Sequence, residues 1–159
     1  MIRLCFVCLG NICRSPTAEG VMLHLLEREG LSAEFEVESA GTAAAHVGER
    51  PDRRALATAR NHGVELPSRA RQFQRADFAR FDLILAMDGS NRDALLALAP
   101  DELARGKVLL LRSFEEGSEL DADVPDPYYG GPEGFEQVFE LCSAACRGLL
   151  AHLRRERRL

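Results

Sequence analysis

Cys8 and Arg14 are separated by five residues in the segment Cys8-Leu9-Gly10-Asn11-Ile12-Cys13-Arg14-Ser15-Pro16. A cysteine thiolate is a nucleophile, and a guanidinium group can bind two oxygens of one phosphate. A loop of this length can curl so that its backbone amides point inward and form an anion cradle with the N-terminus of a following helix. The same positive field stabilises a thiolate. This spacing therefore predicts a nucleophile beneath a bound phosphoryl group.

The neighbours of Cys8 and Arg14 favour this interpretation over a buried thiol and a surface charge. Gly10 and Asn11 tolerate unusual backbone angles, and Pro16 suits the first turn of a helix. Ser15 could cap that helix or point its hydroxyl into the loop. The sequence lacks the Gly-x4-Gly-Lys-Ser/Thr pattern of a nucleotide triphosphate loop. We therefore expect a phosphate-binding loop formed by Leu9, Gly10, Asn11, Ile12, Cys13, Arg14 and Ser15.

The elements that must position this loop follow from hydrophobic patterning. Strands are predicted at residues 2–7, 35–40, 81–87 and 107–111, and helices at residues 16–30, 52–62, 90–98 and 134–155. This alternation predicts an α/β fold with a four-stranded parallel sheet and helices on both faces. The 159 residues suit a single domain, 1–159. Ligands of such sheets bind at the carboxyl ends of strands, which is where Cys8 follows the first strand.

Composition narrows the possible partners and location. The net charge of −5 gives no reason to expect nucleic acid, and the basic run at residues 154–158 is typical of a solvated helix end. No apolar run approaches the roughly 20 residues of a membrane span, so no membrane partner is expected. The cysteine count is five, and no secretory segment precedes Ile2. These features favour a reducing cytoplasm.

Four motifs carry a resemblance to a known family. Besides the loop from Cys8 to Pro16, they are Ser39-Ala40-Gly41-Thr42, Ala86-Met87-Asp88 and Asp126-Pro127-Tyr128-Tyr129. In order and spacing over nearly the whole chain, the sequence resembles the low-molecular-weight protein tyrosine phosphatases. The resemblance implies hydrolysis of phosphotyrosine in proteins and of small aryl phosphates, through a phosphocysteine intermediate and without metal or cofactor. It also implies binding of inorganic phosphate or another oxyanion.

The resemblance assigns three catalytic roles. Cys8 would attack phosphorus, and Arg14 would bind the phosphoryl oxygens and stabilise the transition state. Asp126 would protonate the tyrosine leaving group and then act as base towards water. From the residues alone, Asp126 is one acid in a polar loop that also holds Asp121 and Asp123.

Further roles also follow from the resemblance. Asn11, Ser15, Ser39 and His62 match positions that hold the family's loop in shape, although a histidine at a helix end is otherwise more often packed there.

The substrate cleft would be bordered by Ile12, Ala45, Tyr128 and Tyr129. Many relatives carry an aromatic residue at the position of Ala45, so an aryl-stacking wall would be missing or supplied elsewhere.

Three alternatives differ in chemistry. A thiol-linked arsenate reductase shares the loop but needs relay cysteines, and the sequence has none between Cys13 and Cys142. A protein-arginine phosphatase of the same family tends to carry threonine where this loop has Ile12. A non-catalytic phosphate-binding module would lose the nucleophile or the acid, whereas both are present here.

The remaining cysteines have a redox and a packing interpretation. Cys13 could form a reversible disulfide with Cys8 that protects it from irreversible oxidation, or it could be a packed thiol. Cys142 and Cys146 share one helix face, but no histidine or second pair supports a metal site, so core packing is expected. Cys5 is expected in the core as part of the first strand.

Overall fold

A parallel sheet forms the centre of the computed structural model, which describes residues 1–159. Its strand order is β2-β1-β3-β4, and all neighbours pair in parallel. The strands are β1 Ile2–Cys8, β2 Phe35–Gly41, β3 Leu83–Ala86 and β4 Val108–Leu110. In the register, Cys8 lies opposite Gly41, and Val7 lies opposite Ala86. The predicted four-stranded sheet is confirmed, and the carboxyl ends of β1, β2 and β3 meet at one edge.

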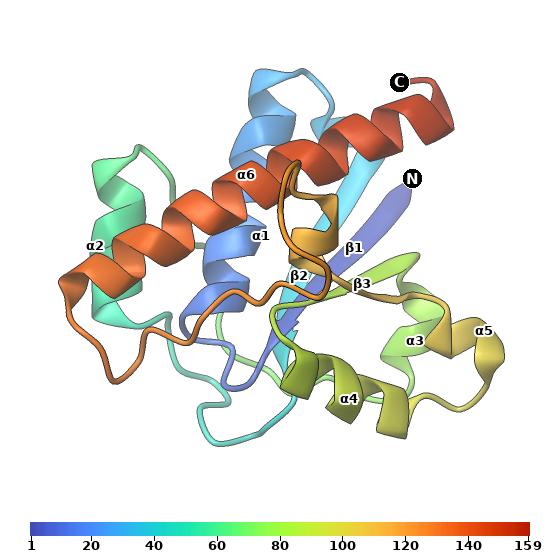
Figure 1. The fold of residues 1–159 in the computed structure, drawn as a ribbon, viewed down its shortest axis with the longest axis horizontal. Coiled ribbons are helices and arrows are strands. Elements are labelled where there is room, and N and C mark those ends of the chain that lie inside the picture. Colours follow the sequence, from blue (N-terminus) through green and yellow to red (C-terminus); the bar gives the residue numbers. More distant parts are fainter.

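Helices cover both faces of the sheet, as predicted (Figure 1). One face carries α1 Arg14–Arg28, α2 Arg53–Asn61 and α6 Pro132–Arg157, and the other carries α3 Asp77–Arg80, α4 Gly89–Leu98 and α5 Glu102–Arg105. Short 3₁₀ helices η1 Ser32–Glu34 and η2 Leu111–Phe114 complete the chain. The elements η1, η2, α3 and α5 were not predicted, because three or four residues are too few to show a helical period.

Strand β1 shows why the sheet is buried on both sides. Leu4 and Phe6 face the core under α1, α2 and α6, whereas Cys5 and Val7 face the core under α3, α4 and α5. All four are fully buried. A strand covered on both faces carries a continuous apolar run, which is how residues 2–7 read in the sequence.

Helix α6 approaches η2 very closely at Gly148. A Cβ atom at this position would lie 1.8 Å from the carbonyl oxygen of Phe114. Only glycine permits this approach without a backbone shift. The contact fixes the start of the irregular chain between η2 and α6, residues 115–131, which we call the acid segment because it contains Asp126.

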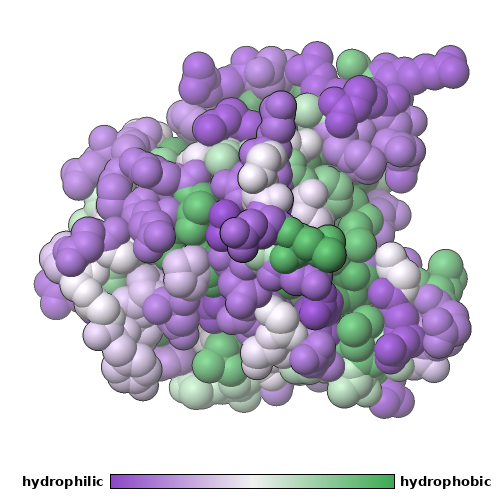
Figure 2. All heavy atoms as spheres, in the orientation of Figure 1, coloured by the Kyte–Doolittle hydropathy of each residue, from purple (hydrophilic) through white to green (hydrophobic).

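The surface is mainly hydrophilic in the view of Figure 2, with small separate hydrophobic patches. None of the helices combines the length and the apolar composition that crossing a membrane requires.

Candidate active site

The loop between β1 and α1 wraps around the Cys8 thiol. Asn11 adopts a left-handed conformation with φ of 57°, which asparagine tolerates better than most residues. The backbone N–H of Asn11 donates to Cys8 Sγ at 3.3 Å. Helix α1 begins at Arg14 without a side-chain cap, so its first amides stay available to an anion. The loop thus has the curled backbone that an anion cradle needs, and we call residues 8–15 the phosphate loop.

Ser15 points its hydroxyl at the thiol and does not cap the helix, the second of the two possibilities for this residue. Ser15 Oγ lies 3.0 Å from Cys8 Sγ. The same oxygen accepts from Asn11 Nδ2 at 2.8 Å, while its distance to the Ala40 carbonyl is a longer 3.4 Å. The single hydroxyl proton of Ser15 is thus free for the sulfur, and it can stabilise a thiolate.

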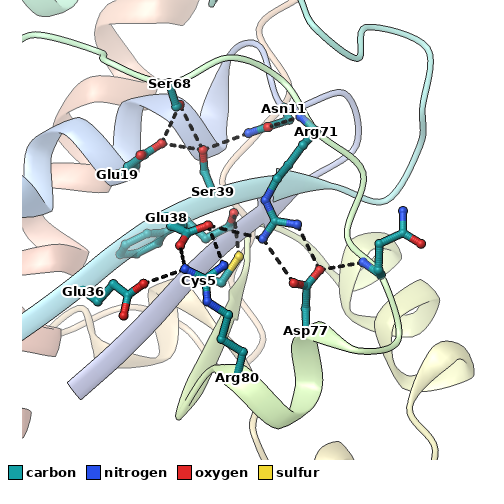
Figure 3. A network of polar contacts seen from close by, with 12 residues as sticks. Cys5, Asn11, Glu19, Glu36, Glu38, Ser39, Ser68, Arg71, Asp77 and Arg80 are labelled. Carbon is teal, nitrogen blue, oxygen red and sulfur yellow. Dashed lines mark hydrogen bonds and ion pairs between the residues drawn. The ribbon is translucent and has the colours of Figure 1, made fainter. Parts of the chain in front are cut away.

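Ser39 extends this chain to a buried carboxyl group, as Figure 3 shows. Asn11 Nδ2 also donates to Ser39 Oγ at 3.0 Å, and Ser39 Oγ donates to Glu19 Oε1 at 2.5 Å. Ser68 Oγ donates to the same Glu19 oxygen at 2.7 Å. Burial raises the pKa of Glu19, and the two serine donors oppose that shift. Sequence reasoning missed Glu19 and Ser68; the only signal was that Glu19 lies one helical turn after Ser15.

His62 does not belong to this network, and its predicted role in loop support is wrong. It ends α2, its Nε2 lies 2.5 Å from Glu136 Oε1, and its ring stacks on Phe139 with centroids 4.2 Å apart. Helix α2 therefore ends against α6 and away from the phosphate loop. The further polar side chain beside Ser39 is that of Ser68, whose Oγ lies 3.4 Å from Ser39 Oγ.

Arg14 is buried and anchored at the edge of the sheet. Its Nη1 donates to Asp88 Oδ2 at 2.6 Å and to the Val124 carbonyl at 3.0 Å. Burial acts to lower the pKa of Arg14, but the charges of Cys8, Asp88 and Asp126 outweigh it and raise the pKa. The sequence assigned Asp88 no role beyond its place in the motif Ala86-Met87-Asp88. Its position directly after β3, at the edge that also carries Cys8, was the signal for an anchoring role.

Asp126 is the one acid of the acid segment that reaches the pocket. Its Oδ2 lies 3.8 Å from Arg14 Nη2, and its Oδ1 accepts from the Tyr128 backbone N–H at 3.1 Å. Its side chain is 45% exposed, so it can exchange protons with water. Asp121 pairs with Arg92 at 3.1 Å, and Asp123 accepts from the backbone N–H of Gly89 at 3.1 Å. Both carboxylates are thereby held away from the thiol.

One pocket of about 110 Å³ brings most of the predicted residues together. It is lined by Cys8, Leu9, Gly10, Ile12, Cys13, Arg14, His46, Asp126, Tyr128 and Tyr129.

Ala45 does not line this pocket and is exposed, so its predicted place at the cleft is wrong. Its neighbour His46 supplies the wall facing Tyr128, with ring centroids 6.3 Å apart. The turn after β2 directs the side chain of residue 46 inward. His46 also packs closely over Gly10, where an added Cβ atom would lie 3.0 Å from His46 Cδ2 and would push the ring slightly aside.

All five cysteines are free thiols and are buried. Burial raises the pKa of Cys13 and of Cys142 to about 12 each, and it raises the pKa of Cys146 well above its usual value. Cys142 and Cys146 lie fully in the core between α6 and α1, as expected from their spacing.

The doubly covered parallel sheet, with a cysteine, an arginine and an aspartate in one pocket at its carboxyl edge, is typical of cysteine-based phosphomonoester hydrolases. Comparisons with known proteins agree. The family model for low molecular weight phosphotyrosine protein phosphatase matches residues 3–159. The chain therefore belongs to the low molecular weight phosphotyrosine protein phosphatase family.

Individual relatives are similar over almost their full lengths. The low molecular weight protein-tyrosine-phosphatase of Streptomyces coelicolor is 49% identical over 97% of this chain and 94% of its own. A crystal structure of a protein tyrosine phosphatase from Entamoeba histolytica, with Hepes in the active site, has a TM-score of 0.94, 37% identity and 99% coverage of both chains. The arginine phosphatase YwlE of Bacillus subtilis has a TM-score of 0.88, 28% identity and 99% coverage of both.

Proposed function

We propose that this enzyme hydrolyses phosphotyrosine in proteins and small aryl phosphates through a phosphocysteine formed on Cys8. The observation that carries the proposal is that Cys8, Arg14 and Asp126 line one pocket. Relatives support the chemistry: one has Hepes in the active site, and a YwlE variant has a phosphorylated active-site serine. These two relatives support binding of an oxyanion in the active site.

In the first step the Cys8 thiolate attacks phosphorus. The S–P bond forms as the bond between phosphorus and the aryl oxygen breaks, and Asp126 gives its proton to that oxygen. Arg14 and the amides of the phosphate loop bind the equatorial oxygens, where negative charge is spread in the transition state. The products are the free phenol, the phosphocysteine and the ionised Asp126.

In the second step water attacks the phosphocysteine. Asp126 takes a proton from the water as the O–P bond forms and the S–P bond breaks, which releases inorganic phosphate. The departing thiolate accepts the Ser15 hydroxyl proton as a hydrogen bond, over the 3.0 Å that separates the two atoms. Asp126 is protonated again and Cys8 is again a thiolate, so the cycle closes.

The walls of the pocket support an aryl substrate over phosphoarginine. Ile12 offers an apolar surface beside the phosphate loop, and His46 and Tyr128 place two rings around the opening. A planar phenyl ring gains contact area there, whereas a guanidinium group would need additional acceptors. We also place the enzyme in the cytoplasm, where a reducing environment keeps Cys8 active.

The test is a turnover profile of the wild type and of Cys8→Ser. Phosphotyrosine should be the best substrate among phosphotyrosine, phosphoserine, phosphoarginine and arsenate with thiol. Cys8→Ser should lose turnover while still binding phosphate, and acid-quenched wild type should contain phosphocysteine. Substantial turnover by Cys8→Ser would show that Cys8 is not the nucleophile. A preference for phosphoarginine would show that phosphoarginine, and not phosphotyrosine, is the substrate. Phosphate binding without turnover in the wild type would indicate a binding module.

A further inference from the structure

The acid segment is anchored on both sides of Asp126. Before it, the backbone N–H of Val124 donates to the Met87 carbonyl at 2.7 Å, and the Val124 carbonyl accepts from Arg14. After it, the Tyr128 carbonyl accepts from Arg54 Nη2 at 3.1 Å. Because Arg14 faces the phosphate, Arg54 is the anchor without a direct role at the phosphoryl group.

Arg54 is itself held rigidly at the start of α2. Its Nε and Nη2 donate to the two oxygens of Asp52 at 3.1 and 3.0 Å. Burial acts to raise the pKa of Asp52, but the hydrogen bonds and charge of Arg54 outweigh it and lower the pKa. The guanidinium carbon lies 4.5 Å from the centre of the Phe135 ring and 5.6 Å from that of Tyr128. Cation–π contacts with both rings restrict its orientation further.

The same pair of residues also contacts the phosphate loop. The backbone N–H of Asp52 donates to the Ile12 carbonyl at 2.7 Å, and the Asp52 side chain caps α2 through the Arg54 N–H at 2.8 Å. Asp52 and Arg54 therefore connect the loop that carries the nucleophile to the segment that carries the acid.

We propose that Arg54 is a positioning residue for the general acid. Tyr128 donates its N–H to Asp126 Oδ1 and its carbonyl accepts from Arg54, so the place of Tyr128 determines the direction of the Asp126 carboxyl group. The inference rests on the proposed role of Asp126 as the acid. Arg54 does not line the pocket, and its one hydrogen bond to the acid segment is the one to the Tyr128 carbonyl.

The expected effect of Arg54→Ala depends on the leaving group. Without its anchor Asp126 samples other positions, and a misplacement of about 1 Å can cost about 100-fold in rate. Single-turnover phosphorylation of Cys8 by phenyl phosphate, whose leaving oxygen is strongly basic, should slow by roughly 10- to 100-fold. Phosphorylation by p-nitrophenyl phosphate, which needs less protonation, should slow by less than about threefold.

A double-mutant cycle separates positioning from a general structural role. Asp126→Asn should slow the phosphorylation of Cys8 by phenyl phosphate by roughly 100- to 10,000-fold. Adding Arg54→Ala to Asp126→Asn should cause almost no further loss of this rate. Arg54→Lys keeps the charge but lacks the planar fork that binds both oxygens of Asp52, so its rate should fall between those of the wild type and Arg54→Ala. Arg60→Ala is the matched control, since Arg60 is an exposed arginine of the same helix with one loose ion pair to Glu65.

Two results would overturn the proposal while leaving Asp126 as the acid. They are equal losses with both substrates in Arg54→Ala, and losses that multiply in the double variant. If Asp126→Asn itself shows no dependence on the leaving group, the assigned acid is wrong, and the positioning role fails with it. A melting temperature of Arg54→Ala close to that of Arg60→Ala, with the leaving-group dependence present, supports the proposal.

Discussion

At the residue scale, Asn11 decides the direction of the hydrogen bonds around the nucleophile. Both of its amide hydrogens go to serine hydroxyls, and its Oδ1 accepts from the Arg71 backbone N–H at 3.0 Å. Ser15 and Ser39 must therefore give their own protons elsewhere, Ser15 to Cys8 and Ser39 to Glu19. A single amide thus prepares a donor for the thiolate on one side and for a buried carboxyl group on the other.

Oxidation of Cys8 tests the protective role of Cys13. Peroxide should convert the Cys8 thiolate to a sulfenic acid, and condensation with the Cys13 thiol would release water and form a disulfide. Because burial raises the pKa of Cys13 to about 12, Cys13 stays protonated and Cys8 is oxidised first. Thiol reductant should restore the activity of the oxidised wild type, and it should restore a smaller fraction of the activity of oxidised Cys13→Ser. Peptide mapping that joins Cys142 to Cys146 and leaves Cys8 reduced would contradict this role.

The sequence revealed the catalytic residues unequally. Cys8 and Arg14 could be predicted because they lie in one short segment whose neighbours all suit a loop before a helix. Asp126 required the family motif, since residue types alone do not distinguish it from Asp123. His46 comes from the turn after another strand, and no spacing along the chain indicates that the topology will bring its side chain to the pocket.

At the element scale, helix α1 serves the site with more than its N-terminus. Its first turn supplies Arg14 and Ser15, and its second turn places Glu19 beneath the phosphate loop, where it is 4% exposed. A buried glutamate without a cationic hydrogen-bonding partner is costly when ionised. The two serine donors offset part of this cost, and the rest is visible as a raised pKa.

Glu19→Gln should change how stability depends on pH. A carboxyl group whose folded-state pKa is raised stabilises the protein fully below its unfolded pKa of about 4.5, and this contribution is lost as pH rises through the folded pKa. The free energy of unfolding of the wild type minus that of Glu19→Gln should therefore fall as the pH rises above about 4.5. Urea unfolding at a series of pH values measures this difference in the free energy of unfolding. A difference that grows with pH would mean that the serine donors stabilise the carboxylate more than burial opposes it.

The long elements were predictable, and the exact contacts between them were not. Strand β1 and helix α6 show their periods over many residues, whereas α3 and α5 are too short to do so. The assignment of His62 failed for a related reason, because the end of α2 could face either the phosphate loop or α6. The packing of α2 against α6 decided that it pairs with Glu136.

At the scale of the whole molecule, the site is where four distant parts of the chain are tied together. Chain segments after β1, β2 and β3 meet there, and the acid segment joins them through Val124 and Tyr128. Arg14 belongs to the first of these parts, contacts the segment after β3 and the acid segment, and is also the residue expected to bind the anion. Binding of an anion should therefore stabilise the protein as a whole.

Inorganic phosphate should raise the melting temperature. A ligand that binds only the folded state stabilises it by about 2.7 kcal/mol at 100 times its Kd. The shift should be seen in wild type and Cys8→Ser, which keeps the cradle, and should be much smaller in Arg14→Ala. An equal rise in Arg14→Ala would show that the anion does not bind where we place it.

The first half of the acid segment offers a place for protein engineering. Gly117 and Asp121 adopt positive φ angles of 80° and 58°, and Leu120 is 93% exposed. The contacts that place Asp126 begin only at Asp123 and Val124. Exposed loop tips ahead of such an anchor tolerate added chain best. A peptide tag or small reporter domain inserted between Gly117 and Leu120 should therefore leave both the sheet and the position of Asp126 unchanged.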